Sequence, residues 1–400
     1  MKQLSEQKQK ILKKLIDYKE LSTEMVLLLA SGRGKYGFQQ GYDVLKELKE
    51  EKIIKKSERV SGSGNYTFTS YYIAPRAKEE MFPNDELAKR SLGTNTIESQ
   101  VKKGDTALMC WLAGVVAYEK TIDGEQAFFQ IENMDLGHKN INPFVEDITK
   151  FNLYAFRYMR IMYGVFIPFE DIRAKFRVTA EDKQHFNYSS TTGVLVGKKN
   201  IYMLYHANHG YLSTRAHAER MMAERVMHYL ARIGITSLTG TCTRIKRGII
   251  FVRNVKDFRR LVTNMYGFEC NRFRDFDYMH IVPETNAGLE LLRLINSYED
   301  ITHLVVKKII SLGKYQYNQR SYFAEYFLLT EKESGRLVYY GVDMNFNTLA
   351  HVYDECQRFK IEFCIMCFEW QEHYYRSVFG DGLDYVILQE DAIVRYLSNL

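Results

Sequence analysis

Residues 61–73 read Ser61-Gly62-Ser63-Gly64-Asn65-Tyr66-Thr67-Phe68-Thr69-Ser70-Tyr71-Tyr72-Ile73, and they decide the fold predicted for the N-terminal region. The serine, glycine and asparagine residues of the first half are typical of a hairpin turn. The second half, 66–73, alternates as a strand does, and the apolar pair Ile53-Ile54 ahead of the turn begins a partner strand. The sequence therefore predicts a two-stranded hairpin.

Three helices are predicted ahead of this hairpin. Apolar residues recur at helical spacing in 5–17, in 23–30 and in about 39–51. Ser22 precedes the second helix, where a serine side chain can cap free backbone N–H groups. Three helices followed by a hairpin is the element order of a winged helix, so residues 1–78 are predicted to form a winged-helix DNA-binding domain. The third helix is expected to bury Tyr42, Leu45 and Leu48.

The excess positive charge of the chain is concentrated in this region. Residues 1–78 hold 13 Lys and 3 Arg against 9 Asp and Glu, a net charge of +7, whereas the whole chain carries +6. A basic module joined to a nearly neutral body is typical of a protein that meets phosphate through that module. A solvated lysine-rich face is the alternative interpretation.

The contacts with DNA are predicted from the way helix-turn-helix proteins dock. The later helix enters the major groove, where its N-terminal residues reach base edges and nearby cations reach phosphates. A winged helix used for protein contacts is the alternative, favoured by the acidic run Glu47, Glu50 and Glu51. The candidate DNA-binding residues are Arg33, Lys35, Gln39, Gln40, Asp43, Lys46 and Arg59.

Length and composition predict a globular, cytoplasmic protein. The 400 residues and 46% hydrophobic content suffice for about two to three domains. No apolar run approaches the roughly 20 residues that span a bilayer, and the N-terminus lacks the apolar core of a signal peptide. Six cysteines without framework spacing favour reduced thiols in the cytoplasm. We therefore expect no membrane association.

The rest of the chain is predicted to be mixed α/β. Residues 79–180 are interpreted as a helical and mixed connector region, and residues 181–400 as an α/β domain. Within the latter, 193–205 has the pattern of a β-hairpin, and beyond Gly248 strands alternate with helices. Such alternation predicts a sheet covered by helices on its faces, in mixed or parallel order.

Cysteine and histidine residues offer two further candidate sites. Cys364 and Cys367 form a Cys-x-x-Cys, but they lie in an apolar strand whose alternation sends them to opposite faces, so they are expected to pack in the core. Four histidines gather in one stretch and are either metal ligands or ordinary loop and helix residues. They are His206, His209, His217 and His228.

Three carboxylates are the candidate catalytic and metal-binding residues. Glu219 lies in a predicted helix, Glu325 in one predicted strand and Asp343 at the end of the next. Two or three converging carboxylates can hold Mg²⁺ for nuclease chemistry. Asp343 follows an apolar strand, where a carboxylate must find a partner, and it could equally cap the following helix.

Several of these segments together resemble the replication–relaxation family of plasmids and integrative elements, which includes mobilisation relaxases. The likeness rests on the winged helix at 5–73 and on four short segments in order along the chain. This resemblance implies a winged helix followed by an α/β sandwich, restriction-endonuclease-like domain. The four segments are 71–76, 188–195 with 202–205, 326–329 and 339–343.

The chain departs from the catalytic members of that family at the positions that cut DNA. Those members place a Pro-Asp pair ahead of the first strand and a Glu two residues before the Asp of the second. Here these positions read Phe323-Ala324 and Gly341, so only Asp343 matches and Glu325 is one place off. The resemblance therefore implies a nuclease-like domain kept for binding.

The favoured hypothesis is a sequence-specific DNA-binding protein of a mobile genetic element, acting in replication, transfer or their regulation. It needs no cofactor, and its partners are double-stranded DNA and either a second copy of the chain or other proteins of the element. One alternative is an Mg²⁺-dependent DNA-nicking relaxase that uses Glu219, Glu325 and Asp343. Another is a ligand-responsive transcriptional regulator.

Overall fold

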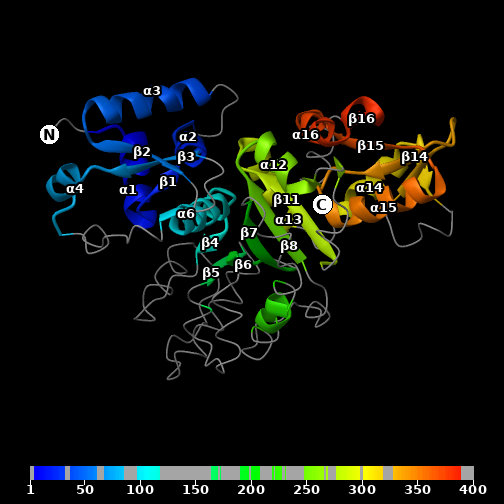
Figure 1. Cartoon of the computed structure of the whole chain (residues 1–400), viewed down its shortest axis with the longest axis horizontal. Helices are drawn as coiled ribbons and strands as arrows, with labels where there is room; N and C mark the ends of the chain where they lie inside the picture. The colour runs from blue at the N-terminus through cyan, green and yellow to red at the C-terminus, as the bar shows by residue number, and fades with distance from the viewer. Residues whose placement is uncertain are drawn as a thin grey trace, which may run out of the picture. The chain divides into compact units, whose positions relative to one another are not determined.

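In the computed structural model, drawn as a ribbon in Figure 1, the chain forms two compact units. The first unit contains Met1–Gly114 and Pro283–Glu290, and the second contains Val115–Val282 and Leu291–Leu400. The structure describes residues 4–31, 37–60, 67–84, 97–117, 164–169, 172, 190–197, 200–207, 219, 221–227, 230, 247–264, 267–268, 276–297, 301–318 and 328–388.

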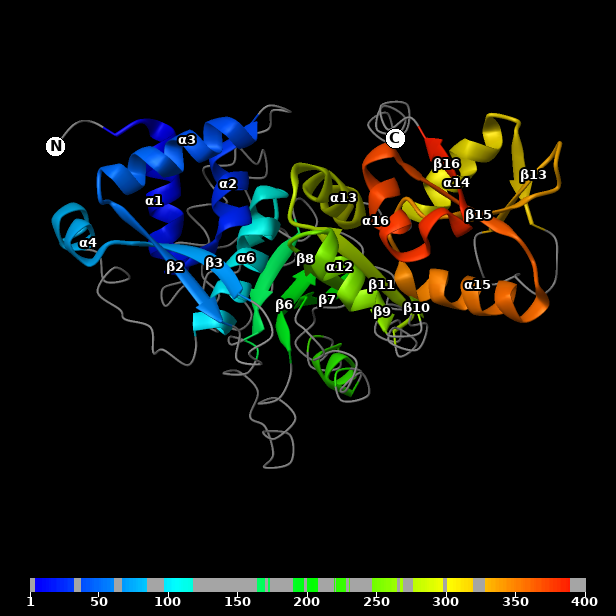
Figure 2. The same ribbon diagram turned by 45° about the horizontal axis from the view of Figure 1, so that its top comes forward.

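The three N-terminal helices predicted from the sequence are present. Helix α1 is Glu6–Tyr18, α2 is Thr23–Ser31 and α3 is Gly37–Glu50. Ser22 caps α2 as expected, because its hydroxyl oxygen accepts the backbone N–H of Met25 at 3.3 Å. Figure 2 shows α3 lying across the neighbouring helices α1 and α2.

A three-stranded antiparallel sheet completes this part of the first unit. Strand β3 (Thr67–Ile73) lies between β1 (Leu21–Ser22) and β2 (Ile54–Val60). The predicted hairpin is confirmed by the register from Ile54 opposite Ile73 to Val60 opposite Thr67. The two-residue strand β1 was not predicted, because two residues are too few to display an alternating pattern.

The buried face of α3 differs from the prediction at one residue. Leu45 and Leu48 are buried as expected, but Tyr42 is 52% exposed. The residue that turns toward α2 is Gly41, where an added Cβ would lie 3.3 Å from Leu27. Because 41, 45 and 48 follow helical spacing, Tyr42 is turned about 100° away from this stripe and points outward.

Two further helices belong to the first unit. Helix α4 is Pro75–Met81, and α6 is Ile97–Leu112. In the structure a Cβ at Gly104 would lie 3.1 Å from Tyr18, so this glycine allows α6 to approach α1.

The second unit contains a six-stranded sheet in the order β11-β8-β7-β6-β5-β4. The predicted hairpin of β6 and β7 is confirmed and antiparallel, while β7 and β8 are parallel. The strands are β4 (Val116–Ala117), β5 (Val165–Pro168), β6 (Thr191–Val196), β7 (Ile201–His206), β8 (Arg247–Val252) and β11 (Tyr278–Pro283). The small pair β9 (Thr263–Asn264) and β10 (Gly267–Phe268) follows helix α12 (Val255–Val262), and α13 is Asn286–Ser297.

A second sheet of five strands lies in the same unit, in the order β12-β13-β14-β15-β16. The first three strands pair antiparallel, and the last two continue the sheet in parallel. This mixed order agrees with the predicted α/β class. The strands are β12 (Tyr315–Tyr317), β13 (Leu328–Glu331), β14 (Leu337–Tyr340), β15 (Phe363–Phe368) and β16 (Asp384–Leu388), with helices α14 (Ile301–Ser311), α15 (Phe346–Phe359) and α16 (Glu369–Phe379) and the short 3-10 turn Gly380–Gly382.

Helices cover both faces of the five-stranded sheet. Cys364 packs with residues of α14 in one apolar cluster, whereas Phe363, on the opposite side of the strand, meets Tyr353 of α15. Cys364 and Cys367 are both fully buried, as expected. Burial raises the pKa of the Cys364 thiol to about 11 and that of Cys367 to about 12, so both stay protonated at neutral pH.

The two sheets of the second unit are joined where the segment after β14 meets the edge strand β11. The backbone N–H of Ile281 donates to the carbonyl of Met344 at 3.0 Å, and His280 bridges to Asn345. The side-chain oxygen of Asn345 also accepts the N–H of Met279 at 3.0 Å. These bonds satisfy backbone groups that the edge of the sheet would otherwise leave open.

We expect Asn345→Ala to lower the free energy of unfolding by about 1–3 kcal/mol, because it leaves the buried N–H of Met279 without its acceptor. Urea unfolding measures this change. Gln357→Ala, which truncates an exposed amide of α15, is the matched control and should stay within about 0.5 kcal/mol of wild type. Equal stabilities of the two variants would contradict the assigned role.

Candidate nucleic-acid interface

The N-terminal half of α3 presents polar side chains to solvent. Gln39, Asp43 and Lys46 are exposed, and so is the ring of Tyr42. Gln39 donates to the Asp43 carboxylate at 3.2 Å, one helical turn away. Lys46 lies 3.9 Å from Glu50, with both side chains mostly exposed. Exposed pairs of this kind contribute little to stability, so these groups can exchange their partners for a ligand.

The C-terminal half of α3 is tied to α1 by a single lysine. The ammonium of Lys8 lies 3.0 Å from Glu47 and 2.9 Å from Glu51. The hydrogen bond to Glu51 is the main reason that the pKa of Lys8 is raised above its ordinary value. Lys8 therefore partly neutralises Glu47 and Glu51. Both belong to the acidic run that favours the protein-contact alternative.

Of the remaining candidate DNA-binding residues, the structure gives the backbone position of two. Arg59 lies on β2 opposite Phe68, and Gln40 lies in α3. Arg33 and Lys35 fall outside the described residues. Tyr42 is the surface residue that sequence reasoning missed, and the small Gly41 beside it was the available signal, because a glycine in a helix often marks a close approach to a neighbour.

Glu219, one of the three candidate catalytic carboxylates, is buried and holds the start of β6. Its Oε1 accepts the backbone N–H of Ser190 at 2.5 Å and the Ser190 hydroxyl at 2.8 Å. Its Oε2 accepts the Thr191 hydroxyl at 3.4 Å. Burial raises the pKa of the neighbouring Tyr205, and the charge of Glu219 adds to this, so that phenol is neutral.

Asp343 lies in the turn after β14, beyond the end of the strand in which the sequence had placed it. It is buried, and its Oδ1 accepts the backbone N–H of Asn345 at 3.2 Å, while its carbonyl oxygen lies 2.8 Å from Nδ1 of His280. Glu325 falls outside the described residues. Among the residues described, neither Glu219 nor Asp343 belongs to a group of three or more potential ligands close enough to share a metal ion.

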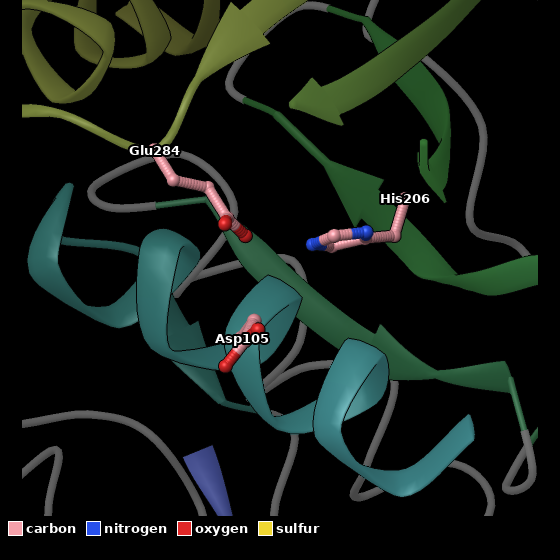
Figure 3. A group of neighbouring side chains, drawn as sticks. All are labelled: Asp105, His206 and Glu284. Atoms are coloured by element: carbon pink, nitrogen blue, oxygen red, sulfur yellow. The ribbon is translucent and has the colours of Figure 1, made fainter. Parts of the chain in front are cut away.

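Figure 3 shows two buried carboxylates of the first unit, Asp105 on α6 and Glu284 just after β11. They offer oxygens within 4.8 Å of each other, and Asp105 also accepts the backbone N–H of Ser22 at 3.0 Å. His206, drawn with them, ends β7 in the second unit. The other clustered histidines, His209, His217 and His228, fall outside the described residues.

The comparisons with known proteins add no relative: no family model, no curated protein and no solved structure matches the chain. Within the part of the chain that is described, no helix combines the length and apolar composition needed to cross a bilayer.

We expect Lys8→Ala to lower the free energy of unfolding at pH 7 by about 1 kcal/mol. Because folding raises the Lys8 pKa, this contribution is fully present below the ordinary lysine value of 10.5 and is lost as the pH rises through the higher folded pKa. Urea unfolding at pH 7 and at a pH above 11 measures both effects. Lys13→Ala, an exposed change on the same helix, should have no comparable effect, and a pH-independent difference for Lys8→Ala would contradict the ion-pair assignment.

Proposed function

We propose that the first unit is a winged-helix module that binds double-stranded DNA through α3, as part of a sequence-specific DNA-binding protein of a mobile genetic element. The order α1-β1-α2-α3-β2-β3 supports this, because it matches the helices and wing of such modules. The observation that carries the proposal is the outward face of Gln39, Tyr42, Asp43 and Lys46 on a helix whose other face is buried.

The chemistry of this face suits a duplex groove. An amide such as Gln39 can pair with an adenine edge, and the ammonium of Lys46 can neutralise a phosphate. Asp43, already hydrogen-bonded to Gln39, orients that amide and can accept from a cytosine amino group. The exposed ring of Tyr42 adds apolar area suited to a thymine methyl group or a sugar.

The fixed position of α3 also favours recognition. Leu45 and Leu48 are buried, Gly41 allows close contact with α2, and Lys8 holds the C-terminal half. Packing against α2 and ion pairs with Lys8 already restrict the motion of α3. The helix therefore loses little further conformational freedom on binding, and this lowers the entropic cost of association.

For the five-stranded sheet we propose a nuclease-like domain kept for binding. The mixed order of a β-hairpin followed by parallel strands, with helices on both faces, is compatible with this proposal. Asp343, the candidate carboxylate that matches the catalytic pattern, already accepts a backbone N–H in the turn that joins the two sheets. A carboxylate engaged in this way is less available to hold Mg²⁺.

We expect Lys46→Ala in the full-length chain to weaken binding to a mixed-sequence 25-bp duplex about fivefold and to lower the slope of log affinity against log salt by about one unit. Fluorescence anisotropy across a salt series measures both quantities. Lys307→Ala, an exposed helical lysine of the second unit, is the matched control. Affinities and slopes that are unchanged for Lys46→Ala would exclude α3 as the phosphate-contacting helix.

We expect Gln39→Ala to change sequence preference more than total affinity, because an amide that pairs with a base discriminates by about 1–3 kcal/mol at one position. Selection of bound duplexes from a random pool, run on wild type and variant, measures the preference. The exposed amide change Gln357→Ala should select the same site as wild type. If Gln39→Ala also selects that site, Gln39 does not read a base.

A further inference from the structure

A second cationic feature lies in the second unit, where β8 and β11 begin. Arg247 is the first residue of β8 and Tyr278 the first of β11. The guanidinium carbon of Arg247 lies 4.8 Å from the centre of the Tyr278 ring. One residue further along, Gly248 packs against Met279. The two strands therefore start side by side at the same end of the sheet.

Arg247 is buried without a counter-ion in the described part of the chain. Its side chain is 9% exposed, and its Nη1 has no hydrogen-bond acceptor. Among the described residues, none forms an ion pair with it, and the contact with Tyr278 is the interaction that the structure provides. A cation over an aromatic face recovers only part of the cost of removing a guanidinium charge from water.

Nη1 of this guanidinium is buried and has no hydrogen-bond acceptor, so an anion that reached it would supply the acceptor that is missing. When an arginine contacts a ring through its flat face, its N–H groups stay in the plane of the guanidinium and can pair with two oxygens of a phosphate. The ring of Tyr278 stacks in turn on His280, with the ring centroids 6.5 Å apart, and Nδ1 of His280 lies 2.8 Å from the carbonyl oxygen of Asp343.

We propose that Arg247, stacked on Tyr278, is a phosphate-binding subsite of the second unit. The group bound is a phosphate monoester or diester, carried either by a free nucleotide or by a nucleic-acid backbone. This proposal does not depend on DNA binding by α3.

The test uses full-length Arg247→Met, which removes the charge while keeping a long side chain, with Arg259→Met on α12 as an exposed control. Three probes are titrated at constant ionic strength: inorganic phosphate and adenosine monophosphate by thermal shift, and a 25-bp duplex by anisotropy in a Lys46→Ala background. We expect Arg247→Met to weaken at least one probe tenfold or more, while Arg259→Met leaves all three within twofold.

The probes separate the two sources of phosphate. Loss confined to adenosine monophosphate and inorganic phosphate identifies a nucleotide site, and loss with the duplex identifies a backbone contact. Wild-type affinity of Arg247→Met for all three probes, or no measurable binding of any probe by wild type, would overturn the proposal.

If Arg247→Met fails to fold by circular dichroism, Arg247→Lys takes its place, because lysine keeps the charge and loses the planar fork. We then expect at least a threefold loss for the probe that binds. Wild-type affinity of this variant for all three probes would likewise overturn the proposal.

Discussion

The close packing of α3 on α2 is the constraint from which the candidate DNA-binding surface follows. Gly41 brings the two helices together, because any larger residue would meet Leu27 at 3.3 Å. With Gly41, Leu45 and Leu48 turned inward, the 3.6-residue period of the helix turns Tyr42, Asp43 and Lys46 outward. The rotation of this helix about its axis thus decides which side chains the candidate surface presents to solvent.

Buried charges elsewhere in the molecule follow a second constraint, the cost of removing an ionised group from water. Glu219 meets it by accepting hydrogen bonds from Ser190 and Thr191, and Asp343 by accepting the N–H of Asn345. Each of these carboxylates stabilises the start of a strand or a turn. Among the described residues, Arg247 has the ring of Tyr278 against its guanidinium and no ion pair, and for this reason we propose it as a binding group.

Much of the local structure could be predicted from the sequence. Helical spacing placed α1, α2 and α3 within two residues of their observed bounds, and strand alternation sent Cys364 and Cys367 to opposite faces of β15. Ser22 as a helix cap was equally predictable. These features depend on residues a few positions apart, and such spacing is what a sequence displays directly.

The sequence by itself therefore determined the order of elements in the first unit, its concentration of positive charge and the apolar stripes of its helices. Only the tertiary structure decided that Tyr42 faces outward, that Lys8 neutralises Glu51 from 43 positions away, and that Asp105 accepts the N–H of Ser22 from 83 positions away. The physical reason is the distance along the chain over which each feature is determined. Periodicity is written into neighbouring residues, whereas the partner of a buried or charged group is set by segments that meet only when the chain packs.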